Sequence, residues 1–99
     1  MTYSEAYYEA YKGLPEALEK SYHKLNFDNH CYLRIALDNT FNAKWDNVIK
    51  RPAYKNLSKE KLERVVGLLQ AYKTDLELLQ SHNAKSLSWR KKLKTNTLN

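Results

Sequence analysis

Residues that interrupt regular backbone structure are scarce in this 99-residue sequence, which has two glycines and two prolines. Sheet-rich folds need many tight turns, and turns are rich in these residue types, so their scarcity argues against an all-β fold. The composition is 42% apolar and 28% charged, which is typical of a folded chain rather than a disordered one. We therefore predict an all-α fold. Residues 1–93 form a single domain, a small bundle of about four helices with a short basic C-terminal helical turn, and residues 94–99 form a frayed polar tail.

Cysteine and long apolar runs are also scarce. The one cysteine, Cys31, cannot form an internal disulfide and is typical of a reducing cytoplasm. No apolar run approaches the roughly 20 residues that cross a bilayer. The first residues lack the basic and apolar regions of a signal peptide. We therefore expect a cytoplasmic protein without a membrane partner.

Signatures of metal sites and of catalysis are missing too. The candidate metal ligands, His23, His30, Cys31 and His82, do not share the i, i+3 or i, i+4 spacing of a helical site. Adjacent residues of a helix point about 100° apart, so His30 and Cys31 cannot form a catalytic dyad by themselves. No glycine-rich phosphate loop, nucleotide fingerprint or nucleophile elbow occurs. We expect no metal, no cofactor and no catalytic residue, and we interpret Cys31 as a small buried apolar residue.

Apolar residues recur at helical spacing along most of the chain. The first predicted helix spans residues 2–12 and stops at Gly13, and the second spans residues 15–25. We interpret the tyrosine stripe of the first helix as its core side, with a docking face as the alternative. We expect Tyr8, which lies off this stripe, to be exposed. The stripe consists of Tyr3, Tyr7 and Tyr11.

Two longer helices follow. The third is predicted at residues 29–49, ending before Pro52, because the residue preceding a proline avoids helical backbone. The fourth is predicted at residues 59–81, capped by Ser58, and we expect Gly67 to allow a close helix crossing. Its heptad seam is expected to pack within the chain, with a second subunit as the alternative, and the two helices to form an antiparallel spine. The seam consists of Leu62, Val65, Leu69, Tyr72, Leu76 and Leu79.

A charged pair interrupts the apolar face of the third predicted helix. On a helical wheel that starts at Leu33, Arg34 falls at about 100° and Asp38 at about 140°, within an apolar arc that ends near 200°. The two residues are four positions apart and can touch. One interpretation is an ordinary ion pair at the rim of the core. The other is a partly buried node, in which Arg34 reaches a carboxylate or carbonyl on another helix, or an anionic ligand, while Asp38 orients it.

Two groups of residues are candidates for binding. One is a polar cluster of Arg34, Asp38, Arg51 and Tyr54. We interpret His82 and Asn83 as the C-cap of the fourth helix, and residues 87–93 as the short basic turn that carries much of the second group. This second group is a basic surface made of Lys85, Trp89, Arg90, Lys91 and Lys92.

Charge is distributed unevenly between the two halves of the sequence. Residues 1–48 hold five bases and seven acids, a charge of −2, whereas residues 49–99 hold twelve bases and four acids, a charge of +8. Such asymmetry favours an anionic partner or an attraction between the halves. We expect a non-catalytic module that binds a protein partner or itself. One alternative is nucleic-acid association through lysine and arginine contacts to phosphates. The other is a small enzyme or ligand-binding protein with a pocket around Arg34, Asp38 and Tyr54.

Overall fold

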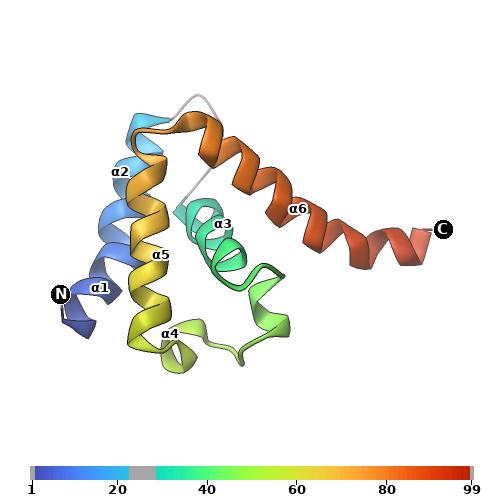
Figure 1. Ribbon diagram of the computed structural model, residues 1–99, viewed down its shortest axis with the longest axis horizontal. Coiled ribbons are helices and arrows are strands. Elements are labelled where there is room, and N and C mark those ends of the chain that lie inside the picture. Colours follow the sequence, from blue (N-terminus) through green and yellow to red (C-terminus); the bar gives the residue numbers. More distant parts are fainter. Residues whose placement is uncertain (1, 23–28, 99) are drawn as a thin grey trace.

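The first helical stretch begins with a reciprocal cap. The Thr2 hydroxyl accepts a hydrogen bond from the Glu5 N–H, and the Glu5 carboxylate accepts one from the Thr2 N–H. The computed structural model describes the backbone of residues 2–22 and 29–98 and the side chains of residues 2–22 and 31–90. Every element in these ranges is helical, which confirms the all-α fold (Figure 1). The end predicted near residue 25 lies outside the described residues.

The predicted stop at Gly13 is wrong. Helix α1 (Tyr3–Tyr8) continues through a π-helical turn, η1 (Glu9–Gly13), into α2 (Leu14–Ser21). Gly13 has right-handed helical angles, with φ −58°, and the Leu14 N–H bonds to the carbonyl of Glu9, five residues earlier. This wider turn carries the chain into α2, where Pro15 stands in the first turn and its missing N–H costs little.

Helix α3 (Asn29–Phe41) ends eight residues before the predicted end at residue 49. Asn42 has φ 53°, a left-handed conformation that asparagine tolerates better than most residues. The Ala43 N–H then bonds to the Asp38 carbonyl at 3.1 Å, which closes the helix end as a Schellman motif. The following residues form a 3-10 turn, η3 (Trp45–Asn47), and a short helix, α4 (Ala53–Asn56).

The fourth predicted helix is two helices. Helix α5 (Lys59–Tyr72) begins with Ser58 as its N-cap, as expected, and α6 (Leu76–Leu98) follows after three residues. The Asp75 carboxylate accepts a hydrogen bond from the Leu78 N–H at 2.9 Å and so caps a new helix. Because α6 is continuous, the C-cap at residues 82–83 and the separate turn at residues 87–93 are also wrong. Fraying of residues 94–99 and the domain boundary at residue 93 stay predictions.

The core lies where α1 and α2, α3 and α5 meet, and α6 extends beyond the other helices (Figure 1). The seam packs within the chain, except that Leu76 is exposed. Since the seam is divided between two helices, α3 packs on both α5 and α6. Gly67 makes no close crossing, because a Cβ atom added there would meet nothing within 4 Å. None of the described helices is long and apolar enough to cross a membrane.

Candidate functional site

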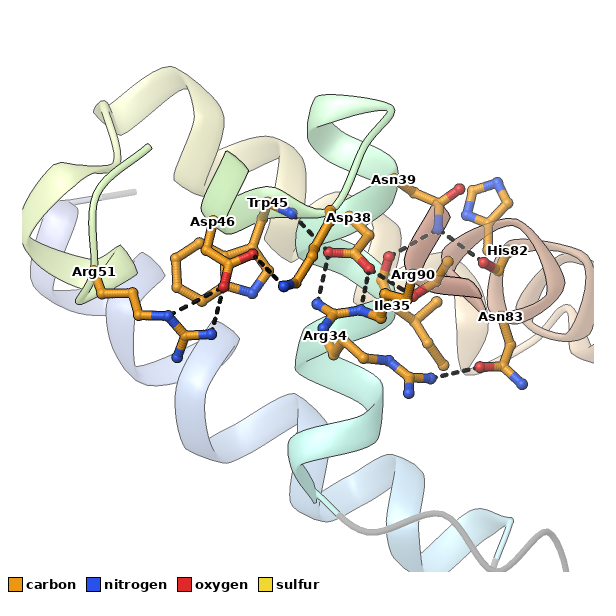
Figure 2. Close-up of polar contacts among 12 residues, drawn as sticks. Arg34, Ile35, Asp38, Asn39, Trp45, Asp46, Arg51, His82, Asn83 and Arg90 are labelled. Atoms are coloured by element: carbon orange, nitrogen blue, oxygen red, sulfur yellow. Dashed lines mark hydrogen bonds and ion pairs between the residues drawn. The ribbon is translucent and has the colours of Figure 1, made fainter. Parts of the chain in front are cut away.

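Asp38 is the centre of the polar contacts between α3 and α6 (Figure 2). It is 0% exposed, which confirms its predicted place on the core-facing side of the third helix. Its Oδ1 accepts from the Trp45 N–H at 3.0 Å and from Arg90 Nη2 at 3.1 Å; its Oδ2 accepts from the Ser86 hydroxyl at 2.7 Å and from Arg90 Nε at 2.8 Å. A carboxylate offers about four acceptor positions. These bonds fill them, so Asp38 joins α3, η3 and α6 and has no acceptor position left for a ligand.

Arg34 lies one turn before Asp38 and also reaches α6. Its Nη2 donates to Asn83 Oδ1 at 2.6 Å. The predicted contact between Arg34 and Asp38 is wrong, because Arg90 approaches the same carboxylate with two N–H groups in the stronger bidentate geometry. The acceptor of Arg34 does belong to another helix, as the node hypothesis expected, but it is a neutral amide. Arg34 and Asp38 are therefore neighbours in one interface with separate partners.

Two more polar contacts extend this interface toward α5. Asn39 Nδ2 donates to the backbone carbonyl of His82 at 3.0 Å, and the hydroxyl of Tyr72 lies 2.7 Å from Nδ1 of the same histidine. Burial lowers the pKa of His82, and the positive charges of Lys85 and Arg64 act in the same direction. Burial raises the pKa of Tyr72. The tyrosine therefore keeps its proton, and we infer that it donates to a neutral imidazole.

Arg51 and Tyr54, the other members of the predicted cluster, lie apart from this interface. Arg51 forms an ion pair with Asp46 and places its guanidinium 5.3 Å from the centre of the Trp45 ring. Burial opposes ionisation of Asp46, but the hydrogen bond from Arg51 and the nearby charges of Lys44 and Arg51 outweigh it, so its pKa is lowered. Tyr54 packs among tyrosines of the first helical stretch. The four predicted residues thus belong to three separate sets of contacts.

A small hollow of about 200 Å³ is lined by residues of two of these sets. It includes Arg34 and Tyr54 but not Asp38, so the predicted pocket is only partly assembled. The hydroxyl of Tyr11 is buried without a hydrogen-bond partner among the described residues, and burial, with the neighbouring tyrosines, raises its pKa to about 12. The lining holds no carboxylate or imidazole that could act as a general base near neutral pH. It consists of Tyr11, Leu33, Arg34, Leu37, Trp45, Ala53 and Tyr54.

The structure describes the side chains of three of the five residues in the predicted basic surface. Lys85 is exposed, but Trp89 is half-buried and Arg90 is bound to Asp38. The side chains of Lys91 and Lys92 lie outside the described residues. Nucleic-acid association through the basic C-terminal half therefore stays a prediction.

The tyrosines of α1 and η1 form a second candidate site with Tyr54. We define the tyrosine patch as Tyr3, Tyr7, Tyr11 and Tyr54. The rings of Tyr7 and Tyr11 are stacked with centres 4.8 Å apart, and Tyr54 meets both edge-on at 5.8 and 6.3 Å. The Tyr3 hydroxyl donates to the Tyr54 carbonyl at 2.8 Å. Because Ala6 and Ala10 are the fully buried residues of this stretch, the tyrosines lie at the edge of the core and not in its centre.

An open hollow of about 600 Å³ lies on the same helical stretch, α1 and η1. We define it as the acidic hollow; Ser4, Glu5, Tyr8 and Glu9 line it. Tyr8 is 53% exposed, which confirms the expectation for this residue. The lack of a side chain at Gly13 leaves room for the side chains of Tyr8 and Glu9. A Cβ atom added at Gly13 would come within 3.1 Å of the Tyr8 ring and 3.0 Å of the Glu9 carboxylate.

Sequence reasoning did not assign Ser86 to a site, and it gave Asn83 and Arg90 different roles. His82, Ser86 and Arg90 recur every four residues, which places them on one side of a helix. This spacing is visible in the sequence, but it indicates a shared helix face only if the helix continues past residue 81. Within the described residues no three His, Cys, Asp or Glu side chains gather where they could hold a metal ion. Cys31 is half-buried.

Comparison with models of known protein families, with curated proteins and with solved structures finds no match to this chain.

Proposed function

We propose that this protein is a non-catalytic binding module that engages a basic, partly apolar segment of another protein chain through the tyrosine patch and the acidic hollow. One observation carries the proposal: the exposed Tyr8 lines an open hollow together with Glu5 and Glu9, and three more exposed tyrosine rings lie on α1 and α4. The exposed rings are Tyr3, Tyr7, Tyr8 and Tyr54.

The chemistry of the tyrosine patch and of the acidic hollow matches a basic, partly apolar segment. Tyrosine rings supply a large contact area at low conformational cost, and they are enriched in protein interfaces. A lysine or arginine can lay its stem on a ring, place its charge over the ring face and pair with a carboxylate. Glu5 keeps its charge, because hydrogen bonds from the Thr2 backbone and side chain lower its pKa.

The arrangement supports binding more strongly than catalysis. Asp38 has its acceptor positions filled, and His82 is held between Tyr72 and Asn39. Neither residue lines either of the two hollows described above. The acidic hollow lacks the histidine, cysteine or lysine that would form a nucleophile or general base with its carboxylates near neutral pH.

A selection from a random dodecapeptide library tests this function. Enriched peptides are expected to carry lysine or arginine next to an aliphatic or aromatic residue. Their affinity should fall by about tenfold or more for Tyr8→Ala and for the Glu5→Gln/Glu9→Gln variant, the size of effect seen at interface hot spots. Glutamine at position 5 preserves the helix cap, so a loss of affinity there reports the charge.

Val48→Ala is the matched control, because Val48 is 53% exposed like Tyr8 but lies between η3 and α4. This variant should bind the same peptides unchanged. Enrichment of acidic peptides, or equal binding to the Tyr8→Ala and Val48→Ala variants, would contradict the proposed binding at the acidic hollow.

A further inference from the structure

The connection between α5 and α6 is short. It consists of Lys73, Thr74 and Asp75, without glycine or proline. Lys73 has helical angles, with φ −64° and ψ −30°, and all three N–H groups bond back to carbonyls of the last turn of α5. A change of backbone angles confined to Thr74 and Asp75 would therefore join α5 and α6 into one helix.

The sequence favours that joined helix. The seam from Leu62 to Leu79 keeps its heptad spacing across the break, and the same spacing predicts one helix there. In the present fold Leu76 is the exposed member of the seam. In a joined helix it would lie on the same face as Leu69 and Tyr72, and the helix from residue 59 to residue 98 would be about 60 Å long.

In a joined helix α6 would move away from α3 and would uncover a polar surface there. The Asp38 carboxylate would lose Ser86 and Arg90, and Arg34 would lose Asn83. Leaving such groups buried without partners is costly. Only another α6 supplies the same donors and acceptors at the same spacing, so these contacts point to a second copy of the chain as the occupant.

We propose that two copies of this protein exchange α6, so that Arg90 of each copy binds Asp38 of the other. Exchange of an identical element preserves every contact of the interface, and short connections favour it. α6 already extends beyond the other helices (Figure 1), where a second molecule can reach it. The exchange involves a different surface from the proposed function and does not depend on it.

Complementary charge variants test the exchange. Asp38→Asn leaves Arg90 without its carboxylate, and Arg90→Gln leaves a buried carboxylate without its guanidinium. In an exchanged heterodimer of the two variants, the introduced asparagine of one chain faces the introduced glutamine of the other, while the native Asp38 and Arg90 meet. Refolding an equimolar mixture of one isotope-labelled and one unlabelled variant, followed by native mass spectrometry, should therefore yield more heterodimer than homodimer.

The matched control mixes wild type with the double variant Asp38→Asn/Arg90→Gln. It contains the same side chains, but exchange now creates two mismatched pairs, so heterodimer should be depleted. Equal heterodimer fractions in the two mixtures, or monomers at every concentration by light scattering, would overturn the proposal.

A second pair of variants tests the joined helix itself. Thr74 is exposed, so changing it spares the core. The Thr74→Ala variant should dimerise about tenfold more tightly than Thr74→Gly, since alanine favours the joined helix and glycine opposes it in both chains. Equal dimerisation constants would contradict the joined helix.

Discussion

Replacing Asp38 by alanine is expected to lower the free energy of unfolding by about 3 kcal/mol. The change removes the carboxylate that joins α3, η3 and α6, and it leaves three groups without their acceptor. These are the backbone N–H of Trp45, the hydroxyl of Ser86 and the guanidinium of Arg90.

The magnitude follows from the burial of each group. Ser86 is fully buried, so its unsatisfied hydroxyl costs about 1–3 kcal/mol. Breaking a fully buried ion pair costs about 3–5 kcal/mol. The side chain of Arg90 is 26% exposed and can recover part of its hydration, which lowers that cost. A total near 3 kcal/mol is several times the value of an ion pair on the surface of a helix.

Asp46→Ala is the matched control, since Asp46 also pairs with an arginine, which lies five residues further along the same connecting region. The side chain of that partner, Arg51, is 69% exposed, so water replaces the lost carboxylate at little cost. We expect a loss of at most about 1 kcal/mol.

Equilibrium unfolding in urea, followed by far-ultraviolet circular dichroism, measures both variants. A cost below about 1 kcal/mol for Asp38→Ala, or one no larger than that of Asp46→Ala, would refute the prediction, because the pair would then behave like a surface pair. Arg90→Gln and the Asp38→Asn/Arg90→Gln double variant separate the pair from the other bonds. The double variant should cost less than the sum of its single changes, by about 1–3 kcal/mol.

Two further outcomes are expected. Because burial lowers the pKa of His82 below its usual value of 6.5, the folded state disfavours the imidazolium, so stability should fall as the pH drops through about 6.5 and level off below the folded-state pKa. The His82→Gln variant should show a smaller difference in unfolding free energy between about pH 7.5 and about pH 5 than the wild type. An unchanged difference would assign the pH dependence to other groups. Gly67→Ala should raise the free energy of unfolding by about 0.5–1 kcal/mol, because a Cβ there meets nothing within 4 Å inside a helix; thermal unfolding showing a loss would indicate a contact at that site.

The helix content could be predicted from the sequence, because apolar spacing and caps such as Ser58 act within a few residues. The early end of α3 depends on Asn42 taking a left-handed conformation, which asparagine adopts only where the surroundings favour it. The same limit applies at Gly13, a common helix terminator that here stands inside a π-helical turn. A residue such as Asn42 or Gly13 is compatible both with the end of a helix and with its continuation, and the packing of the folded chain determines which of the two occurs.

The break between α5 and α6 at residues 73–75 could not be predicted from the sequence for a different reason. The heptad spacing continues across it, and an N-cap at Asp75 is a weak signal beside six apolar residues in register. The partner of Asp38 then became unpredictable as well, since Ser86 and Arg90 face α3 only after α6 has turned away from α5. A carboxylate on a core-facing arc indicates that a partner is needed, but the sequence does not say which donor supplies it.

The polar contacts between α3 and α6 explain why α6 settles in one position. Apolar packing contributes, because a slide of one helical turn would put Asp75 or Asn83 in the place of the buried Leu79. A slide of four residues would bring Ser86 to the place of Arg90, or Arg90 to the place of Ser86, opposite Asp38. Either shift breaks the bidentate pair, and the Asn83 amide would also leave Arg34. The interface is therefore selective for this sequence in this register, whether the helix belongs to its own chain or to a second copy.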